Sequence, residues 1–404
     1  MQVTFSNREH PELGSVILPF PIPYEEYENS ITRLASIGLG AVTARDCYIE
    51  SVIDEAAVLQ CLKGTLVNVD EVDYLWKNLE ILASNGDFEK FECMAALKGY
   101  TDIKDLINLA LCCPQATVIK DFSNLKEVGM DHFLTIRGGS APADEASRQD
   151  GEQIMRELIA SGKGHITPYG VVFENDMEMK ELYQGGNFPA IGYEPSLADA
   201  ILTPTVAPQE REMLRLLLPM PEKQLERMLE RAGFETDRDY TLEFMFIQMP
   251  KEISTIIETG KDGLYEINHL CQILRPLEGP EMERLAAAVA MANAERSSQI
   301  RRLVENIDQF RFAKDVRTAD DYGLYLIQES GRYGFDKDLA RYYDYEKCGR
   351  EQMEQENGRI IDSGYICYEG ETPLDVLMMD DPPESEPTPL RPKKPIAHSR
   401  GAER

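Results

Sequence analysis

Residues 18–23 of the chain are Leu-Pro-Phe-Pro-Ile-Pro, and residues 24–28 are Tyr-Glu-Glu-Tyr-Glu. A similar segment recurs at residues 218–226, where Leu-Pro-Met-Pro is followed by Glu-Lys-Gln-Leu-Glu. Each segment follows an apolar run that favours a strand, and the prolines end that run. Proline is tolerated in the first turn of a helix, and glutamates there complement the helix dipole. The pattern therefore predicts a strand followed by an acidic helix at both places.

The two predicted helices each have an apolar face at helical spacing and an opposite face that carries carboxylates. The apolar faces consist of Tyr24, Tyr27, Ile31 and Leu34 in the first helix, and of Leu225, Met228, Leu229 and Ala232 in the second. Because a whole structural unit recurs, an internal repeat is the first hypothesis to examine.

Four further blocks recur in the same order along the chain, at an offset of about 195 positions. An alternating strand-like segment, a helical segment, a longer ungapped stretch that shares Gly129 and Gly323, and a late strand follow one another in both halves. The paired blocks are 46–50 with 239–243, 71–79 with 266–274, 106–129 with 300–323, and 169–173 with 363–367. The order predicts a tandem duplication. The alternative is that any two α+β stretches align at this low identity.

The strand and helix patterns predict an α+β protein built from small modules. We expect the first copy to contain an α+β, a helical and a second α+β module, and the second copy to repeat this series. The predicted modules are 1–66, 67–135 and 136–200 in the first copy, 205–260, 261–316 and 317–379 in the second, and a proline-rich disordered tail at 380–404.

The composition indicates a soluble cytoplasmic protein. The 404 residues are 43% hydrophobic, which suffices for folded cores, and no apolar run approaches the ~18 residues that a membrane span needs. The eight cysteines show no Cys-x-x-Cys spacing and follow no secretory leader, so we expect them to be reduced core residues. The net charge is −29, and both halves contribute to the acidic excess.

The sequence contains no recognisable catalytic motif. Its five histidines are scattered and none has metal-ligand spacing, so we expect no metal and no cofactor. The glycine pairs at 138–139 and 185–186 lack the context of a phosphate loop and are typical of turns. We therefore expect a protein that is not an enzyme. An acid–base hydrolase stays open as an alternative, because a catalytic carboxyl pair cannot be picked out among 71 acidic residues.

The negative net charge indicates which class of partner the protein can bind. A strongly acidic surface repels nucleic acids and membranes and attracts basic grooves. Acidic residues recur on the polar faces of the predicted helices in both copies. The alternative is that the charge serves solubility alone.

A family resemblance enters at the end of the second copy, in residues 343–350 (YDYEKCGR) and 363–366 (SGYI), preceded by 306–310 and 321–326. This region resembles the C-terminal part of the ArdA antirestriction proteins of conjugative elements, in which a Tyr-Glu-x-x-Gly-Arg stretch follows an acidic helical segment. The resemblance is good over about 300–370, is weaker over 205–300, and reaches the first copy mainly through the duplication. Family members are about one copy long, so this chain departs from them by being doubled.

The resemblance implies an elongated mimic of DNA that occupies the DNA-binding groove of type I restriction-modification enzymes and binds neither nucleic acid nor membrane. Since the family forms two-fold dimers, we expect a monomeric pseudo-dimer of the two copies or a homodimer. The carboxylates expected to stand in for phosphates are Glu25, Glu26, Glu28, Asp70, Glu71, Asp73, Glu222, Glu226, Glu230, Glu305 and Asp308. The alternative is a non-enzymatic scaffold or regulator of a mobile element that binds another protein.

Overall fold

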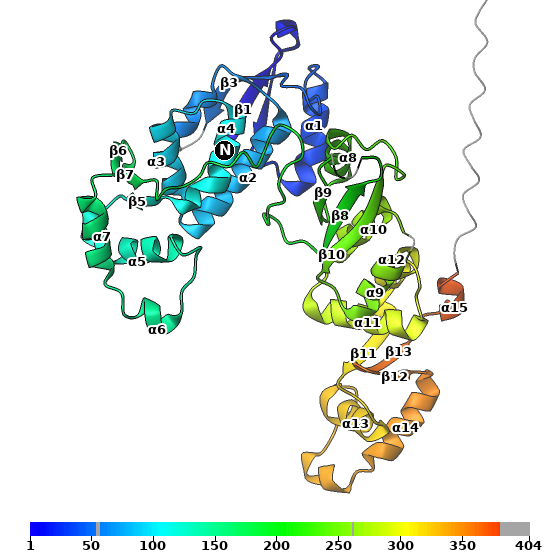
Figure 1. Cartoon of the computed structure of the whole chain (residues 1–404). Helices are drawn as coiled ribbons and strands as arrows, with labels where there is room; N and C mark the ends of the chain where they lie inside the picture. The colour runs from blue at the N-terminus through cyan, green and yellow to red at the C-terminus, as the bar shows by residue number, and fades with distance from the viewer. Residues whose placement is uncertain (54–56, 208, 210, 261, 380–404) are drawn as a thin grey trace, which may run out of the picture. The chain divides into compact units, whose positions relative to one another are not determined.

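A computed structural model of the chain describes residues 1–379, apart from 54–56, 208, 210 and 261. The fold is α+β, as predicted, with helices packed on four small separate sheets (Figure 1). The chain divides into two compact units: unit one is Met1–Met249 with Lys261–Pro276, and unit two is Pro250–Gly260 with Leu277–Arg404. The predicted tail at 380–404 lies outside the described residues. None of the helices in the described part of the chain is long and apolar enough to span a membrane.

Unit one begins with an antiparallel sheet in the order β2-β1-β3-β4, covered by helix α1. Alternation along β2 buries Val16 and Leu18 and leaves Ile17 exposed, as expected for a sheet with one face on the core. The predicted apolar face of α1 is confirmed, with Tyr27, Ile31 and Leu34 buried and Tyr24 half-buried. The elements are β1 Gln2–Ser6, β2 Ser15–Pro19, α1 Tyr27–Ala35, β3 Cys47–Ile53 and β4 Leu66–Val67.

Three helices follow, of which α2 is the central one. Helix α2 starts at Asn68, whose side chain accepts a hydrogen bond from the Asp70 N–H, and it ends at Gly86 in the left-handed conformation. Val72, Leu75, Trp76 and Leu79, which follow one another along it at helical spacing, are buried. The helices are α2 Val69–Asn85, α3 Phe88–Lys98 and α4 Ile103–Cys112.

A small sheet in the order β5-β7-β6 packs with helices α5 and α7. Because β5 pairs with β7, the boundary predicted between residues 135 and 136 cuts through this module, which starts at about Thr117 instead. The elements are β5 Thr117–Ile119, α5 Leu125–Thr135, α6 Ala143–Ala146, α7 Gly151–Ala160, β6 His165–Thr167 and β7 Gly170–Phe173.

Unit one ends with a third sheet, in the order β10-β8-β9. The strand of this sheet that comes first in the sequence, β8, lies in the middle, just as β1 lies between β2 and β3 in the first sheet. In α8, Leu225 and Leu229 are buried as predicted, whereas Met228 and Ala232 are half-buried. The elements are β8 Ala198–Pro204, β9 Leu214–Leu218, α8 Glu222–Arg231, β10 Tyr240–Ile247 and α10 Leu264–Leu274.

Unit two contains a helical part and a sheet in the order β11-β13-β12. The strand β11 pairs with β13, so the boundary predicted between residues 316 and 317 also cuts through a sheet module. The elements are α9 Lys251–Thr259, α11 Gly279–Ala292, α12 Ser297–Glu305, β11 Phe310–Lys314, α13 Ala319–Leu324, α14 Tyr345–Glu356, β12 Arg359–Ile361, β13 Gly364–Tyr368 and α15 Leu374–Leu377.

The two three-stranded sheets β5-β7-β6 and β11-β13-β12 repeat one another in register. Thr117 pairs with Phe173 in the first sheet, and Arg311 pairs with Cys367 in the second. The pairing of β6 with β7 likewise matches the pairing of β12 with β13, and the residue numbers of the two sheets differ by the same amount in both pairings. The helix crossing beside each sheet is also alike, because a Cβ atom on Gly129 or Gly323 would overlap a carbonyl oxygen of the facing helix. These glycines are the pair that the sequence comparison matched.

Candidate partner-binding site

Three of the predicted contact carboxylates lie at the start of helix α1. Glu25 and Glu26 belong to a 3-10 turn, Tyr24–Glu26, and Glu28 belongs to the first turn of α1. All three are exposed and form no ion pair with any residue in the described ranges. Because the opposite face of α1 packs on the core, these carboxylates face solvent and are accessible to a partner.

Helix α8 carries a second group of carboxylates. Glu222 and Glu230 are exposed, and the half-buried Glu226 pairs with Lys223, whose Nζ lies 2.7 Å from its carboxylate. Helix α8 lies against α1, so these two groups of carboxylates belong to adjoining helices of unit one (Figure 1).

Two further carboxylates that sequence reasoning missed adjoin this group. Asp237 and Glu266 flank Gly263 at the start of α10, where a Cβ atom would lie 2.8 Å from a Glu266 oxygen and 3.9 Å from an Asp237 oxygen. Burial raises the pKa of Tyr265, and the charges of Glu226, Asp237 and Glu222 raise it further. The carboxylates therefore converge on one surface. The chain fold brings them together, and only the helix periodicity of α8 was visible in the sequence.

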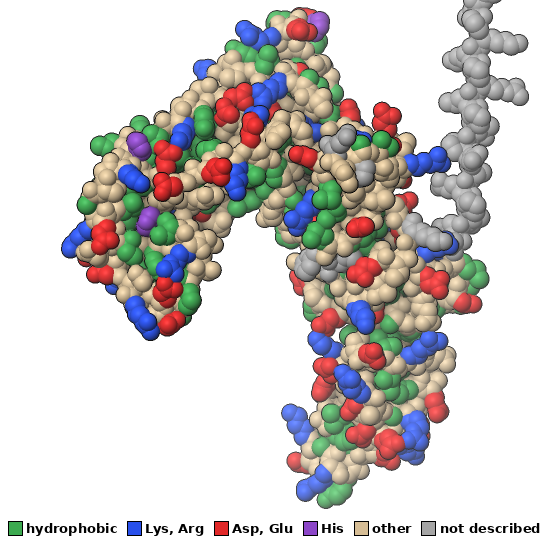
Figure 2. All heavy atoms as spheres, in the orientation of Figure 1, with side chains coloured by type: hydrophobic (Ala, Val, Ile, Leu, Met, Phe, Trp, Pro, Cys, Tyr) green, Lys and Arg blue, Asp and Glu red, His purple; other side chains and the backbone are tan. Residues whose placement is uncertain are grey.

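The last two predicted carboxylates belong to unit two. Glu305 is the final residue of α12, and Asp308 lies in the 3-10 turn Ile307–Gln309. Both are exposed. Figure 2 shows acidic and basic side chains interspersed on the visible face of each unit. The candidate site is therefore defined by the carboxylates on particular helices, and the visible face is not uniformly acidic.

The structure corrects the placement of Asp70, Glu71 and Asp73. These residues were expected on a polar, solvent-facing side of their helix, but all three are buried. The whole first half of α2 is enclosed, because other elements cover the side that carries these carboxylates. Each carboxylate has a basic partner inside the protein, so none of the three is available to replace a phosphate.

Asp70 occupies the centre of an ion-paired network that joins three helices. Arg227 of α8 donates from Nε and Nη2 to the Asp70 carboxylate, with the Nη2 contact at 2.7 Å, and Tyr27 of α1 donates its hydroxyl at 2.7 Å. Arg227 is 4% exposed and also donates to the backbone oxygens of Gly40 and Ala41. The buried charges are thus paired and hydrogen-bonded, as burial requires.

The neighbouring carboxylates are held in the same way. Glu71 accepts hydrogen bonds from Arg45 and from the hydroxyl of Tyr183 at 3.0 Å. Asp73 pairs with Lys77 at 2.8 Å and accepts the backbone N–H of Ile22. Burial raises the pKa of Asp73, and the Lys77 charge offsets this increase only in part. These contacts fix α2 in the core of unit one.

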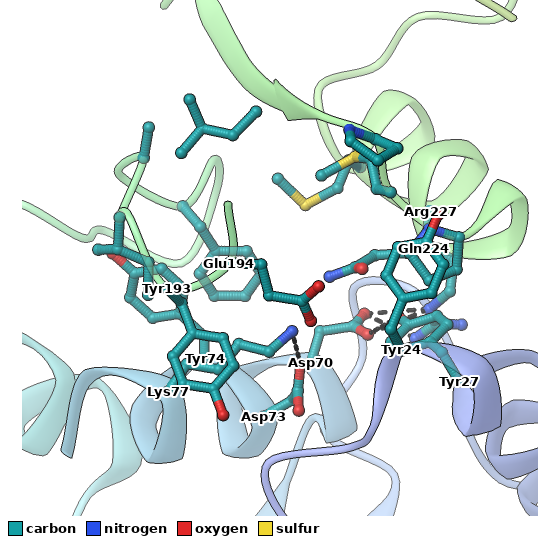
Figure 3. Close-up of a pocket in the computed structure, with 18 of the residues that line it drawn as sticks. Tyr24, Tyr27, Asp70, Asp73, Tyr74, Lys77, Tyr193, Glu194, Gln224 and Arg227 are labelled. Carbon is teal, nitrogen blue, oxygen red and sulfur yellow. Dashed lines mark hydrogen bonds and ion pairs between the residues drawn. The ribbon is translucent and has the colours of Figure 1, made fainter. Parts of the chain in front are cut away.

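A cavity of about 120 Å³ adjoins the Asp70 network (Figure 3). It lies within unit one, among α1, α2, α8 and the segment 188–195. Its acidic side chains already have partners: Lys77 points at Asp73, and Arg275 pairs with Glu194 at 2.7 Å. Among the residues that the structure describes, no group of three or more His, Cys, Asp and Glu side chains is arranged to hold a metal ion. The cavity therefore belongs to the packing within unit one.

Residues 216–367 match the family model described as antirestriction protein (ArdA). The chain contains an ArdA-like segment. No curated protein matches the chain. The ArdA-like segment starts within β9, includes α8 with Glu222, Glu226 and Glu230, and ends within β13. The resemblance noted in residues 300–370 is confirmed, and the match extends it N-terminally through the weaker stretch 205–300 as far as residue 216.

Within the ArdA-like segment, the Tyr-Glu-x-x-Gly-Arg stretch is structural. It forms the start of α14, where the buried Gly349 lies so close to α13 that a Cβ atom would overlap the Ala319 carbonyl oxygen. Glu356 at the end of α14 accepts hydrogen bonds from the hydroxyls of Tyr322 and Tyr365 and pairs with Arg311. Burial raises the pKa of Glu356, but these partners outweigh burial and hold it below the usual value.

Proposed function

We propose that the protein is an antirestriction protein of the ArdA type and that it acts as an acidic mimic of DNA. The match of residues 216–367 to the ArdA family carries the proposal. In this mechanism, exposed carboxylates take the places of DNA phosphates in the basic groove of a type I restriction-modification enzyme. Binding is competitive and electrostatic, and no residue of the inhibitor is turned over.

The charge is large enough for this mechanism. Duplex DNA carries about one negative charge per 1.7 Å of axis, so a net charge of −29 corresponds to roughly 50 Å of duplex. The exposed carboxylates that support the proposal lie on α1 and α8 in unit one and near the end of α12 in unit two. Internal ion pairs occupy several of the basic residues, among them Arg45, Lys77 and Arg227, which leaves surface carboxylates without partners.

The doubling of the chain is part of the proposal. The matched registers of β5-β7-β6 and β11-β13-β12 support a tandem duplication, and the contact of α1 with α8 supports a single-chain pseudo-dimer. Such an inhibitor acts in the cytoplasm, where restriction enzymes meet incoming DNA. It suits a conjugative element, which enters a new host as unmodified DNA.

The test is cleavage of unmodified DNA by a purified type I restriction enzyme, titrated with the full-length protein at two salt concentrations. We expect inhibition near stoichiometric amounts, and a marked loss of potency at the higher salt because counter-ions screen exposed charges. A direct competition between the protein and labelled duplex DNA for the enzyme then shows that both bind the same groove.

Two outcomes would count against the proposal. Inhibition that is insensitive to salt would indicate an apolar interface, as expected for a scaffold or regulator that binds another protein. No inhibition of several type I enzymes would refute the antirestriction role, and the ArdA-like segment would then need another explanation.

A further inference from the structure

The buried network around Asp70 links the two repeats within unit one. Its carboxylate belongs to α2 of the first repeat, and its two arginine partners, Arg227 and Arg231, belong to α8 of the second. Asp70 is 9% exposed and Arg227 is 4% exposed. The same Nη2 of Arg231 that lies 3.4 Å from the Asp70 carboxylate also donates to the backbone oxygen of Val42 at 2.5 Å and to the Asn68 side chain at 2.8 Å. The two arginines therefore fix α8 to the first repeat through buried ion pairs and hydrogen bonds.

The segment that connects the repeats is held by one of these arginines, Arg231. Phe188 stacks on both Tyr74 and Tyr183, with ring centroids 4.7 and 4.9 Å away, and Arg231 lies over the Phe188 ring at 4.7 Å. The backbone of Tyr183 is also hydrogen-bonded in both directions to the Asn108 side chain. The connection is thus packed onto the first repeat, and α8 is fixed both by its own contacts and by the connection that leads to it.

The contact runs in one direction only. Helix α1 has a single arginine, Arg33, which donates to the backbone oxygen of Ile17 in its own repeat. At the offset of about 195 positions that aligns α2 with α10, the counterpart of Asp70 is Tyr265, which has no carboxylate to pair with an arginine. The proposed pseudo-dimer therefore rests on the packing of α1 against α8, and the ion-paired tie within that contact is asymmetric.

We infer that Asp70, Arg227 and Arg231 are positioning residues, which fix the carboxylates of α8 relative to those of α1 so that both engage one basic groove together. This inference rests on the proposed function. A buried ion pair adds little net stability compared with apolar residues of similar size, and its best-attested use is to specify one arrangement of packed elements. Here that arrangement joins Glu25, Glu26 and Glu28 to Glu222 and Glu230.

Rigid coupling has a measurable consequence for binding. Two charged groups held at a fixed spacing bind as one unit, whereas two independently moving groups lose the advantage of pre-organisation and of high effective concentration. Loss of the tie should therefore weaken inhibition by about tenfold or more without removing a single surface carboxylate. It should also reduce the salt dependence, because fewer ionic contacts form at the same time.

The test uses the double variant Asp70→Asn with Arg227→Met in the full-length protein. The two changes cancel in net charge and leave neither Asp70 nor Arg227 buried without its partner, while Arg231 keeps its hydrogen bonds to the Val42 backbone oxygen and the Asn68 side chain. The matched control is Glu89→Gln with Lys120→Met, which removes an exposed ion pair of unit one, 3.0 Å long, and is equally neutral in charge. A second variant, Arg227→Lys, keeps the charge beside Asp70 but lacks the geometry to reach the Gly40 and Ala41 carbonyls as well.

Three measurements are made on each variant: thermal unfolding, amide hydrogen exchange, and inhibition of the type I enzyme over a range of salt. We expect the double variant to stay folded, to exchange faster in α8 and in residues 183–193, and to inhibit with the reduced potency and shallower salt slope described above. The control should match the wild type, and Arg227→Lys should lie between. A variant that is only less stable would contain less folded, active protein, but the salt dependence of its inhibition would stay that of the wild type.

The outcomes separate the inference from the function on which it rests. Unchanged potency and slope in a double variant whose α8 exchanges faster would overturn the inference, and so would unchanged exchange. If the double variant does not fold, Arg227→Lys decides by the same criteria. If the wild type itself does not inhibit, the proposed function fails, and with it the role of these residues in engaging a groove, while exchange still shows whether the tie fixes α8.

Discussion

Neutralising the exposed carboxylates of α1 and α8 tests the proposed surface most directly. The variant replaces Glu25, Glu26, Glu28, Glu222 and Glu230 with glutamine, which keeps side-chain size and hydrogen-bonding ability. None of the five pairs with a described residue of the protein, so their loss should leave stability nearly unchanged. Any effect on inhibition then reflects contacts with the partner.

The expected magnitude follows from the energy of exposed ion pairs. Each such pair contributes about 0.5 kcal/mol, so five together give about 2.5 kcal/mol, or roughly a 70-fold increase in Kd. Each single substitution should cost only about twofold. The assay is displacement of labelled unmodified DNA from the type I enzyme, measured at low and physiological salt, with circular dichroism to confirm folding.

A charge-matched control shows whether position matters. It neutralises five exposed acidic residues outside these helices, namely Glu50, Glu127, Glu157, Glu178 and Glu212. We expect the control to lose much less affinity than the α1 and α8 variant. Equal losses in the two variants would refute the assignment, because they would show that the enzyme senses net charge alone. A single substitution that abolishes inhibition in a folded protein would instead indicate one dominant contact.

Three further predictions concern the interior. Asp73→Asn combined with Lys77→Met removes both buried charges and should change stability by less than about 1 kcal/mol, because Asn268 accepts a backbone N–H in the corresponding place after β9, whereas Asp73→Ala, which leaves Lys77 unpaired, should cost about 3–5 kcal/mol in urea unfolding. Gly323→Ala should cost more than about 3 kcal/mol by calorimetry, because its Cβ would overlap backbone of the facing helix, whereas Gly334→Ala, in open space, should be neutral. The folded state lowers the pKa of Glu356 below 4.5, so the contribution of Glu356 to stability is present above the unfolded pKa and is lost as pH falls through the folded pKa. Glu356→Gln should therefore flatten the acid side of a plot of melting temperature against pH. An unchanged acid side would contradict this prediction.

Local patterns in the sequence were sufficient to predict the strands and helices. The prolines at 19–23 and 219–221 mark where a strand ends and an acidic helix begins, and the structure places β2 with α1, and β9 with α8, accordingly. The glycine pair Gly129 and Gly323 was visible as a match between the repeats, because close helix crossings constrain the residue type strongly. Such features depend on neighbours in the sequence or on direct steric limits.

The misplacement of Asp70, Glu71 and Asp73 has a physical reason. Their burial depends on partners that are remote in sequence: Arg227 is 157 residues from Asp70, and Tyr183 is 112 residues from Glu71. Helical periodicity identifies a polar face but does not show whether another element covers it. One signal was present in the chain, since the position equivalent to Asp73 is Asn268, an uncharged residue that does not suit a phosphate mimic but does suit a buried hydrogen bond.

The buried and the exposed carboxylates of this chain have opposite roles that net charge does not distinguish. A carboxylate inside the protein is useful only with a fixed basic partner, and the arginines that satisfy Asp70 and Glu71 are thereby withdrawn from the surface. Each internal pair thus neutralises one positive charge that would otherwise compete with a basic groove for the exposed glutamates. The same pairs hold the helices that carry those glutamates. In the proposed mechanism, the internal ion pairs therefore determine where the excess charge lies and how rigidly it is presented.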